Sequence, residues 1–228
     1  MSNNSLIEVQ DVEYRYETRE SESASAVLRG VSLTVQAGEM VCLMGPSGSG
    51  KTTLLNLMGL LEKPQVGDIR FIGQSVKGLS ESALEIHRLR DLGFIFQAFF
   101  LVPTLSVLDN TTYFLGPLGL GAREAKERAT EVLEKVGLQD HLLKYPRELS
   151  GGQRQRVAVA RAVAKRPKVI LADEPTANLD RATAEKIVSV FQELRDHEGT
   201  SFVFSTHDRD LLGYAQSVYR LQDGKVVR

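Results

Sequence analysis

A run of glycines and small polar residues ends in Lys51-Thr52 and has the spacing of a phosphate-binding loop. The run reads Gly45-Pro46-Ser47-Gly48-Ser49-Gly50-Lys51-Thr52 and is followed by Thr53. Glycines let successive backbone N–H groups turn inward around an anion, and the N-terminus of a following helix adds partial positive charge. We expect Lys51 to reach the β- and γ-phosphates of a nucleoside triphosphate and the Thr52 hydroxyl to bind Mg²⁺, which prefers oxygen ligands. An ordinary glycine-rich turn is disfavoured because an apolar run precedes the motif and a leucine-rich helical pattern follows it.

Two adjacent carboxylates, Asp173 and Glu174, follow the apolar run 169–172. Ligands of open α/β sheets gather at the carboxyl ends of the strands, so these acids should lie near the phosphate-binding loop. Asp173 is then expected to hold Mg²⁺ through its water shell, and Glu174 to polarise the water that attacks the γ-phosphate. Two acids at a strand end are common as a solvated cap. Beside a phosphate-binding loop, two such acids predict hydrolysis of the bound nucleoside triphosphate.

The elements that position these residues follow from the periodicity of apolar side chains. Residues 6–16 and 31–35 predict an antiparallel hairpin, and Asp223-Gly224 between 218–221 and 225–227 predicts another. Further strands are expected at 40–44, 67–72, 93–97, 169–173 and 201–206, and helices at 51–61, 153–165 and 183–196. We therefore predict one α/β domain over residues 1–228. Its fold is that of a P-loop NTPase, with a mostly parallel, RecA-like sheet, an antiparallel β edge at the N-terminus and an inserted helical subdomain at about 98–165.

Composition excludes several classes of function. The chain has 228 residues, a net charge of -1 and a pI near 6.5, so it carries no basic field for a nucleic-acid backbone. A single cysteine, Cys42, gives no reason to expect an oxidising compartment. The sequence has no signal segment and no apolar run of about 18 residues. We expect a cytoplasmic protein whose membrane role, if any, goes through a partner.

The pentapeptide Leu149-Ser150-Gly151-Gly152-Gln153 resembles the signature motif of the ABC ATPases. Other motifs of that family occur in its order: an aromatic residue at Tyr16, a glutamine at Gln97, Asn178-Leu179-Asp180 and a histidine at His207. Each position also has an ordinary structural explanation. Tyr16 could be a strand aromatic, Gln97 a polar residue at a strand end and His207 a loop histidine.

The resemblance implies an ATPase that binds ATP and Mg²⁺ and acts as a homodimer. In that family the adenine stacks on the residue at Tyr16, Gln97 meets Mg²⁺ or the attacking water, and His207 contacts the γ-phosphate and orients Glu174. Ser150 to Gln153 and Asp180 belong to a composite site that completes the ATP site of the other subunit. The implied partners are transmembrane permease subunits, which hold the ATPase at the inner face of the cell membrane.

Two points stay open in the sequence. The apolar run 98–103 could be the surface where the permease docks or part of the core. Residues 92–97 and 174–180 look most like the branch of lipoprotein-releasing and macrolide-export ATPases, although Ala177 stands where that branch usually has glycine. A cell-division ATPase is the nearest alternative. A soluble ABC ATPase of DNA repair or translation is disfavoured because the chain has neither long coiled coils nor a second ATPase domain, and a small-molecule kinase is remote.

Overall fold

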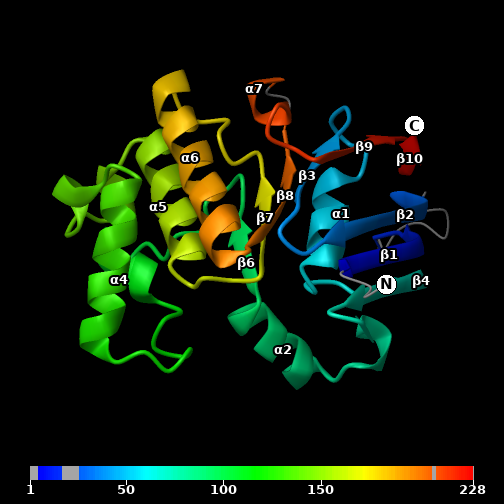
Figure 1. The fold of residues 1–228 in the computed structure, drawn as a ribbon, viewed down its shortest axis with the longest axis horizontal. Helices are drawn as coiled ribbons and strands as arrows, with labels where there is room; N and C mark the ends of the chain where they lie inside the picture. The colour runs from blue at the N-terminus through cyan, green and yellow to red at the C-terminus, as the bar shows by residue number, and fades with distance from the viewer. Residues whose placement is uncertain (1–4, 17–25, 207–208, 228) are drawn as a thin grey trace.

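Two β-sheets and a layer of helices make up the protein, seen here in a computed structural model that describes residues 5–16, 26–206 and 209–227 (Figure 1). The first sheet is antiparallel, with strand order β2 (Leu28–Gln36), β1 (Ser5–Tyr14), β4 (Val66–Phe71) and β5 (Gln74–Ser75). The second sheet has six strands, in the order β10 (Lys225–Val227), β9 (Ser217–Gln222), β3 (Met40–Met44), β8 (Ser201–Ser205), β7 (Val169–Asp173) and β6 (Leu92–Ile95). Its strands are parallel except for β10, which closes the expected C-terminal hairpin. The prediction of an α/β fold with an antiparallel edge is confirmed.

The strand at 67–72 lies in a different sheet from the one we expected. Its alternation with helices along the chain predicts that it belongs to the mostly parallel sheet. In the structure β4 pairs antiparallel with β1, from Ile7 opposite Phe71 to Glu13 opposite Val66. Periodicity identifies a strand but does not name its partner, because pairing is a contact between distant parts of the chain. The antiparallel edge is therefore a four-stranded sheet and not a hairpin.

Each face of the six-stranded sheet packs against its own core. On β3, Met40 and Cys42 belong to the core on the side of the helical layer, whereas Val41 and Leu43 belong to the core shared with the antiparallel sheet. Helix α1 (Lys51–Met58) fills that second core and lies between the two sheets (Figure 1). Strands that are apolar on both faces are typical of parallel sheets covered on both sides. This packing fixes the start of α1 beside the carboxyl ends of β3, β7 and β8.

The helices have the following bounds. After α1 come α2 (Glu81–Arg90), α3 (Val107–Thr112), α4 (Ala122–Lys135), α5 (Gly151–Val163), α6 (Arg181–Glu198) and α7 (Arg209–Leu212), with short 3₁₀ turns at Val76–Gly78, Gln139–His141 and Pro146–Glu148. Between β6 and β7 the structure contains helices and loops only. None of the described helices is long and apolar enough to cross a membrane.

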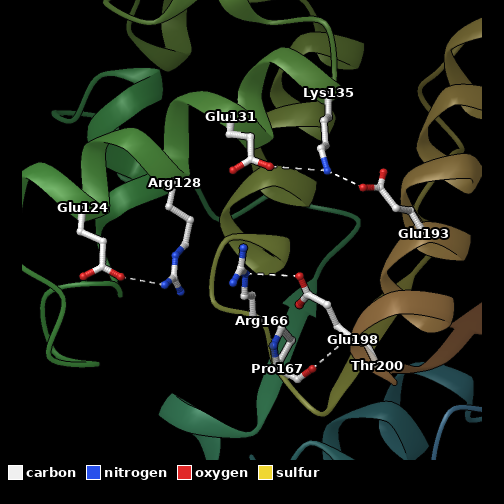
Figure 2. Close-up of polar contacts among 9 residues, drawn as sticks. All are labelled: Glu124, Arg128, Glu131, Lys135, Arg166, Pro167, Glu193, Glu198 and Thr200. Atoms are coloured by element: carbon white, nitrogen blue, oxygen red, sulfur yellow. Dashed lines mark hydrogen bonds and ion pairs between the residues drawn. The ribbon is translucent and has the colours of Figure 1, made fainter.

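Ion pairs join α4 to the neighbouring helix α6 (Figure 2). Lys135 on α4 lies 2.5 Å from Glu193 on α6 and 3.7 Å from Glu131, and these carboxylates raise its pKa. Below them, Arg166 lies 3.3 Å from Glu198. These side chains are substantially exposed, and exposed pairs contribute at most about 1 kcal/mol each. The helical layer is therefore held mainly by its apolar packing.

Candidate functional site

A cavity of about 710 Å³ opens at the carboxyl ends of the parallel strands. Four segments reach it: the loop after β3, the acids at the end of β7, the residue after β8 and the segment after β6. Among the residues that we predicted for the site, it is lined by Ser47, Gly48, Gly50, Lys51, Thr52, Thr53, Gln97, Asp173 and Glu174. The edge of the sheet thus brings together motifs that lie more than 100 residues apart in the sequence.

The loop from Gly45 to Gly50 adopts backbone geometry that demands glycine at several positions. Gly48 and Gly50 have φ values of 79° and 103°, and Gly50 caps the start of α1. A side chain at Gly45 would meet the carbonyl oxygen of Leu221 at 2.2 Å. Lys51 is 8% exposed, and its Nζ donates to the carbonyl oxygens of Gly45 and Pro46 at 2.8 and 3.0 Å. The ammonium group is therefore held over the loop. Within the loop, the N–H of Ser49 donates a hydrogen bond to the carbonyl oxygen of Pro46.

Asp173 is held by hydrogen bonds from two sides. The Thr52 hydroxyl donates to Oδ2 of Asp173 at 2.7 Å, and the Ser205 hydroxyl donates to Oδ1 at 2.5 Å. The N–H of Glu174 donates to Oγ of Ser205 at 3.1 Å, and Glu174 has a left-handed φ of 51°. Such a backbone turn is uncommon for a side chain larger than glycine and is found at functional sites. The oxygen atoms of Thr52 and Asp173 suit Mg²⁺, which prefers hard oxygen ligands.

Of the two predicted residues Tyr16 and Gln97, only Gln97 lines the cavity. Tyr16 is 43% exposed, its hydroxyl lies 3.2 Å from Oγ1 of Thr53, and its ring packs edge-on against Tyr14 at 5.2 Å. Tyr14 is buried, so the two tyrosines differ in role even though they alternate on the same stretch. Gln97 is exposed and lines the cavity, two residues beyond the end of β6 at Ile95. The strand is thus shorter than the predicted 93–97.

The pentapeptide 149–153 lies at the start of α5, away from the lining of the cavity. Ser150 caps this helix: its Oγ accepts from the N–H of Gln153, and Oε1 of Gln153 accepts from the N–H of Ser150. A side chain at Gly152 would meet the carbonyl oxygen of Asn178 at 2.8 Å, whereas Gly151 has open space around it. Asp180 caps α6 by accepting from the N–H and hydroxyl of Thr183 at 3.0 and 2.7 Å, and these bonds lower its pKa. Within one subunit, Ser150 of the signature motif and Asp180 both serve as helix caps.

Some residues of the site escaped the sequence analysis. Ser205 was seen as part of a buried strand, and its bonds to Asp173 and Glu174 depend on the β7–β8 register, which places Asp173 opposite Ser205. Val27 lines the cavity although no motif marks it. The other unpredicted lining residues are Thr176, Ala177, Leu179 and Thr206. His207, which we expected beside the γ-phosphate, lies outside the described residues.

A second cavity, of about 370 Å³, opens between α2, β6, α5 and the run 98–103. Its walls are mostly apolar and include Phe94, Phe96, Phe100 and Phe114. Phe100 is 64% exposed and packs edge-on against Phe96 at 5.1 Å. Arg161 donates to the carbonyl oxygens of Phe99 and Phe100 and so holds their left-handed turn. Phe100 therefore borders a surface groove, whereas Leu101 of the same run packs against the core of the helical layer.

Comparisons with known proteins agree on one family. A family model described as ABC transporter matches residues 28–177. The lipoprotein-releasing system ATP-binding protein LolD of Aquifex aeolicus is 43% identical over 201 residues, which are 88% of this chain and 89% of that protein. The macrolide export ATP-binding/permease protein MacB of Syntrophobacter fumaroxidans is 44% identical over 223 residues, which are 97% of this chain. The chain spans only 31% of the length of that MacB protein.

A solved structure shares the whole fold. The dimer of the ATP-binding cassette MJ0796, in a post-hydrolysis state with ADP and Pi, superposes with a TM-score of 0.93 at 37% identity. The match covers 97% of both chains.

Proposed function

The chain belongs to the ABC transporter family of ATP-binding cassettes, and we propose that it is the ATP-hydrolysing subunit of a membrane transporter. The observation that carries the proposal is the meeting of Lys51, the Thr52–Asp173 pair and Glu174 in one cavity. A cation for the phosphates, oxygen ligands for Mg²⁺ and a carboxylate for water are the parts that phosphoryl transfer to water requires. An ordinary glycine-rich turn would need none of them.

In this proposal the side chains around the phosphates have separate tasks. Lys51 exchanges the carbonyl oxygens of Gly45 and Pro46 for β- and γ-phosphate oxygens, and the loop amides hold the remaining charge. Thr52 and Asp173, with Gln97, hold Mg²⁺, which neutralises charge on the phosphates when bound. Glu174 accepts a proton from the attacking water. The exposed ring of Tyr16 stacks on the adenine.

The signature motif completes the site of a second copy of the chain. Ser150 opens α5 with free N–H groups, which form an anion site, but this helix start does not line the cavity of its own subunit. A head-to-tail dimer brings it to the γ-phosphate of the partner copy. The dimeric MJ0796 cassette, which carries ADP and Pi, supports this arrangement. ATP binding then drives dimerisation, and hydrolysis releases it.

The groove beside Phe100 is the proposed docking surface for a transmembrane permease. It is apolar, open and bordered by the exposed side chains of Leu61 and Phe100. A short amphipathic helix can place its apolar face into such a groove. The relatives named LolD and MacB suggest lipoprotein release or export of macrolides or peptides, with a cell-division role as the alternative. The chain would then be held at the inner face of the cell membrane through its permease.

The test begins with the purified protein. Phosphate release from ATP is expected in the presence of Mg²⁺ and is expected to stop with EDTA, while ADP gives none. Tagged protein taken from detergent-solubilised membranes is expected to copurify with a multispanning membrane protein. Absence of Mg²⁺-dependent hydrolysis would overturn the assignment as an ATPase. Hydrolysis by a protein that copurifies with no membrane partner would overturn the assignment to a transporter.

A further inference from the structure

The hairpin of β9 and β10 lies behind the wall of the nucleotide cavity: none of its residues lines the cavity, but it contacts the phosphate-binding loop and the segment around Val27. The carbonyl oxygen of Leu221 lies against Gly45 of the phosphate-binding loop. At the tip of the hairpin, the carbonyl oxygen of Gly224 accepts a hydrogen bond of 2.8 Å from the N–H of Arg29. The tip is therefore fastened to the start of β2, which Val27 immediately precedes.

Val27 forms part of the cavity wall, and its carbonyl oxygen is enclosed by two glycines. A Cβ on Gly224 would lie 2.4 Å from this oxygen, and a Cβ on Gly50 would lie 3.2 Å from it. Ordinary contacts of a Cβ start near 3.4 Å. Gly224 thus comes as close to Val27 as it does because it has no side chain. The N–H of Val27 is bonded to the carbonyl oxygen of Tyr14, two residues before Tyr16.

We propose that Gly224 is a positioning residue for the nucleoside end of the ATP site. The Asp223-Gly224 turn holds the Val27 backbone against Gly50, and this fixes the place of the Val27 side chain in the cavity wall beside the end of β1, two residues before Tyr16. The inference rests on the proposed ATP-binding function. It extends that function because it separates what fixes the nucleoside from what fixes the phosphates: the side-chain hydrogen bonds of Lys51, Thr52 and Asp173 go to the phosphate-binding loop, to each other and to the end of β8.

The chain contains a close control for this turn. Ile72-Gly73, between β4 and β5, has φ values of 50° and 76°, and Asp223-Gly224 has 49° and 76°. A Cβ on Gly73 would have nothing within 4 Å. The backbone strain of an alanine at a left-handed φ is therefore the same at both turns. The difference in ATPase kinetics between Gly224→Ala and Gly73→Ala therefore measures the effect of the contact with Val27.

The experiment measures ATP hydrolysis by the full chain, with Mg²⁺-tripolyphosphate as a competitive inhibitor that has phosphates but no nucleoside. In Gly224→Ala we expect KM for ATP to rise about tenfold, since the cavity wall at Val27 is displaced from the nucleoside, while kcat and the inhibition constant of tripolyphosphate stay within about twofold. In Gly73→Ala all three stay within about twofold. Equal KM values in the two variants would overturn the inference, as would a parallel rise of KM and the inhibition constant, which would mean that the hairpin supports the phosphate loop instead.

Two further outcomes of the experiment bear on the inference. If Gly224→Ala does not fold, Gly224→Asn is compared with Gly73→Asn, because asparagine tolerates the left-handed region. Failure of Gly224→Asn to fold while Gly73→Asn folds would overturn the inference, since Gly224 would then serve the fold as a whole. A wild-type chain that neither binds nor hydrolyses ATP would overturn the proposed function itself.

Discussion

The hydroxyl of Thr52 donates a hydrogen bond of 2.7 Å to Oδ2 of Asp173 across 121 positions of sequence. This bond joins the first turn of α1 to the end of β7. Oδ1 of the same carboxylate accepts from Ser205 at the end of β8, so Asp173 is held between two elements. Three separate segments thus place the Thr52 hydroxyl and the Asp173 carboxylate, the proposed Mg²⁺ ligands, side by side. Such preorganisation lowers the ordering cost of binding Mg²⁺.

Ser205→Ala tests this support of the metal ligand. The change removes the bond to Asp173 and one of two acceptors for the N–H of Glu174, which keeps the carbonyl oxygen of Ser205 at 3.2 Å. We expect the Mg²⁺ concentration for half-maximal hydrolysis to rise about tenfold, the usual scale for a residue that orients a metal ligand, with little change in Mg²⁺-free ATP binding. Ser201→Ala, at the other end of β8, is the control. An unchanged Mg²⁺ requirement in Ser205→Ala would contradict the role.

Gly152→Ala tests the contact between the signature motif and the loop before α6. Its Cβ would lie 2.8 Å from the carbonyl oxygen of Asn178, which is backbone and cannot easily move. We expect unfolding in urea to show a loss of about 1–3 kcal/mol, as for other overpacked sites. Gly151→Ala is the control, because its Cβ meets open space and alanine favours a helix. Equal stability of both variants would show that the loop gives way.

Sequence alone predicted the parts of the site that are local. The run from Gly45 to Thr52 and the pair Asp173-Glu174 are recognisable because spacing within a few residues fixes their geometry. The strands and α1 were likewise marked by periodicity. The bond from Ser205 to Asp173 was not predictable in this way, because it depends on which strands are neighbours and in which register. For the same reason β4 was assigned to the wrong sheet.

The surface features needed coordinates for a different reason. An apolar run such as 98–103 reads the same whether it is buried or exposed, and only the left-handed turn at Phe99-Phe100, held by Arg161, turns Phe100 outward. Val27 belongs to no motif, and the glycine that approaches its carbonyl oxygen, Gly224, lies almost 200 residues away in the sequence.

Phe100→Asp tests the docking groove. Phe100 is 64% exposed, so we expect the isolated subunit to keep its melting temperature within a few degrees and its basal ATPase activity within about twofold. Copurification with the permease is expected to be lost, because a charge replaces the apolar rim. Tyr113→Asp is the control, at another exposed aromatic residue in the helical layer. Normal copurification of Phe100→Asp would place the docking surface elsewhere.

Lys165 gives a prediction about pH. Burial, with a smaller contribution from Arg161, lowers the pKa of Lys165 from 10.5 to about 8, and its Nζ donates to the carbonyl oxygens of Arg88 and Leu92. Between pH 8 and 10.5 the unfolded chain keeps the proton and the folded chain loses it, so this group makes the free energy of unfolding rise with pH, by up to about 3 kcal/mol.

The measurement compares wild type with Lys165→Met in urea at pH 7 to 9. The thiol of Cys42, whose burial raises its pKa to about 12, acts in the opposite direction once the thiol of the unfolded chain ionises near pH 9, but both proteins carry it, so its effect cancels in the comparison. We expect the wild type to gain stability relative to Lys165→Met as the pH rises through 8. Parallel curves would mean that Lys165 is charged throughout the range.

Glu174→Gln tests the chemistry and the dimer together. The change keeps the size of the side chain but removes the carboxylate that accepts a proton from water, so hydrolysis is expected to fall by about 10²- to 10⁴-fold. ATP binding is expected to survive, because Lys51, Thr52 and Asp173 are unchanged. Two ATP molecules that are not consumed act as ligands of the dimer alone, and mass action then accumulates it.

Light scattering during size-exclusion chromatography measures this accumulation. With ATP, Glu174→Gln is expected to elute as a dimer and wild type mainly as a monomer, and with ADP both are expected to be monomers. Glu185→Gln, on the exposed side of α6, is the control and is expected to behave like wild type. If Glu174→Gln keeps wild-type turnover, Glu174 is not the base. If it loses turnover but stays monomeric at saturating ATP, the base is correct and the composite site is wrong, because Ser150 of a second copy would then have no part in holding the γ-phosphate.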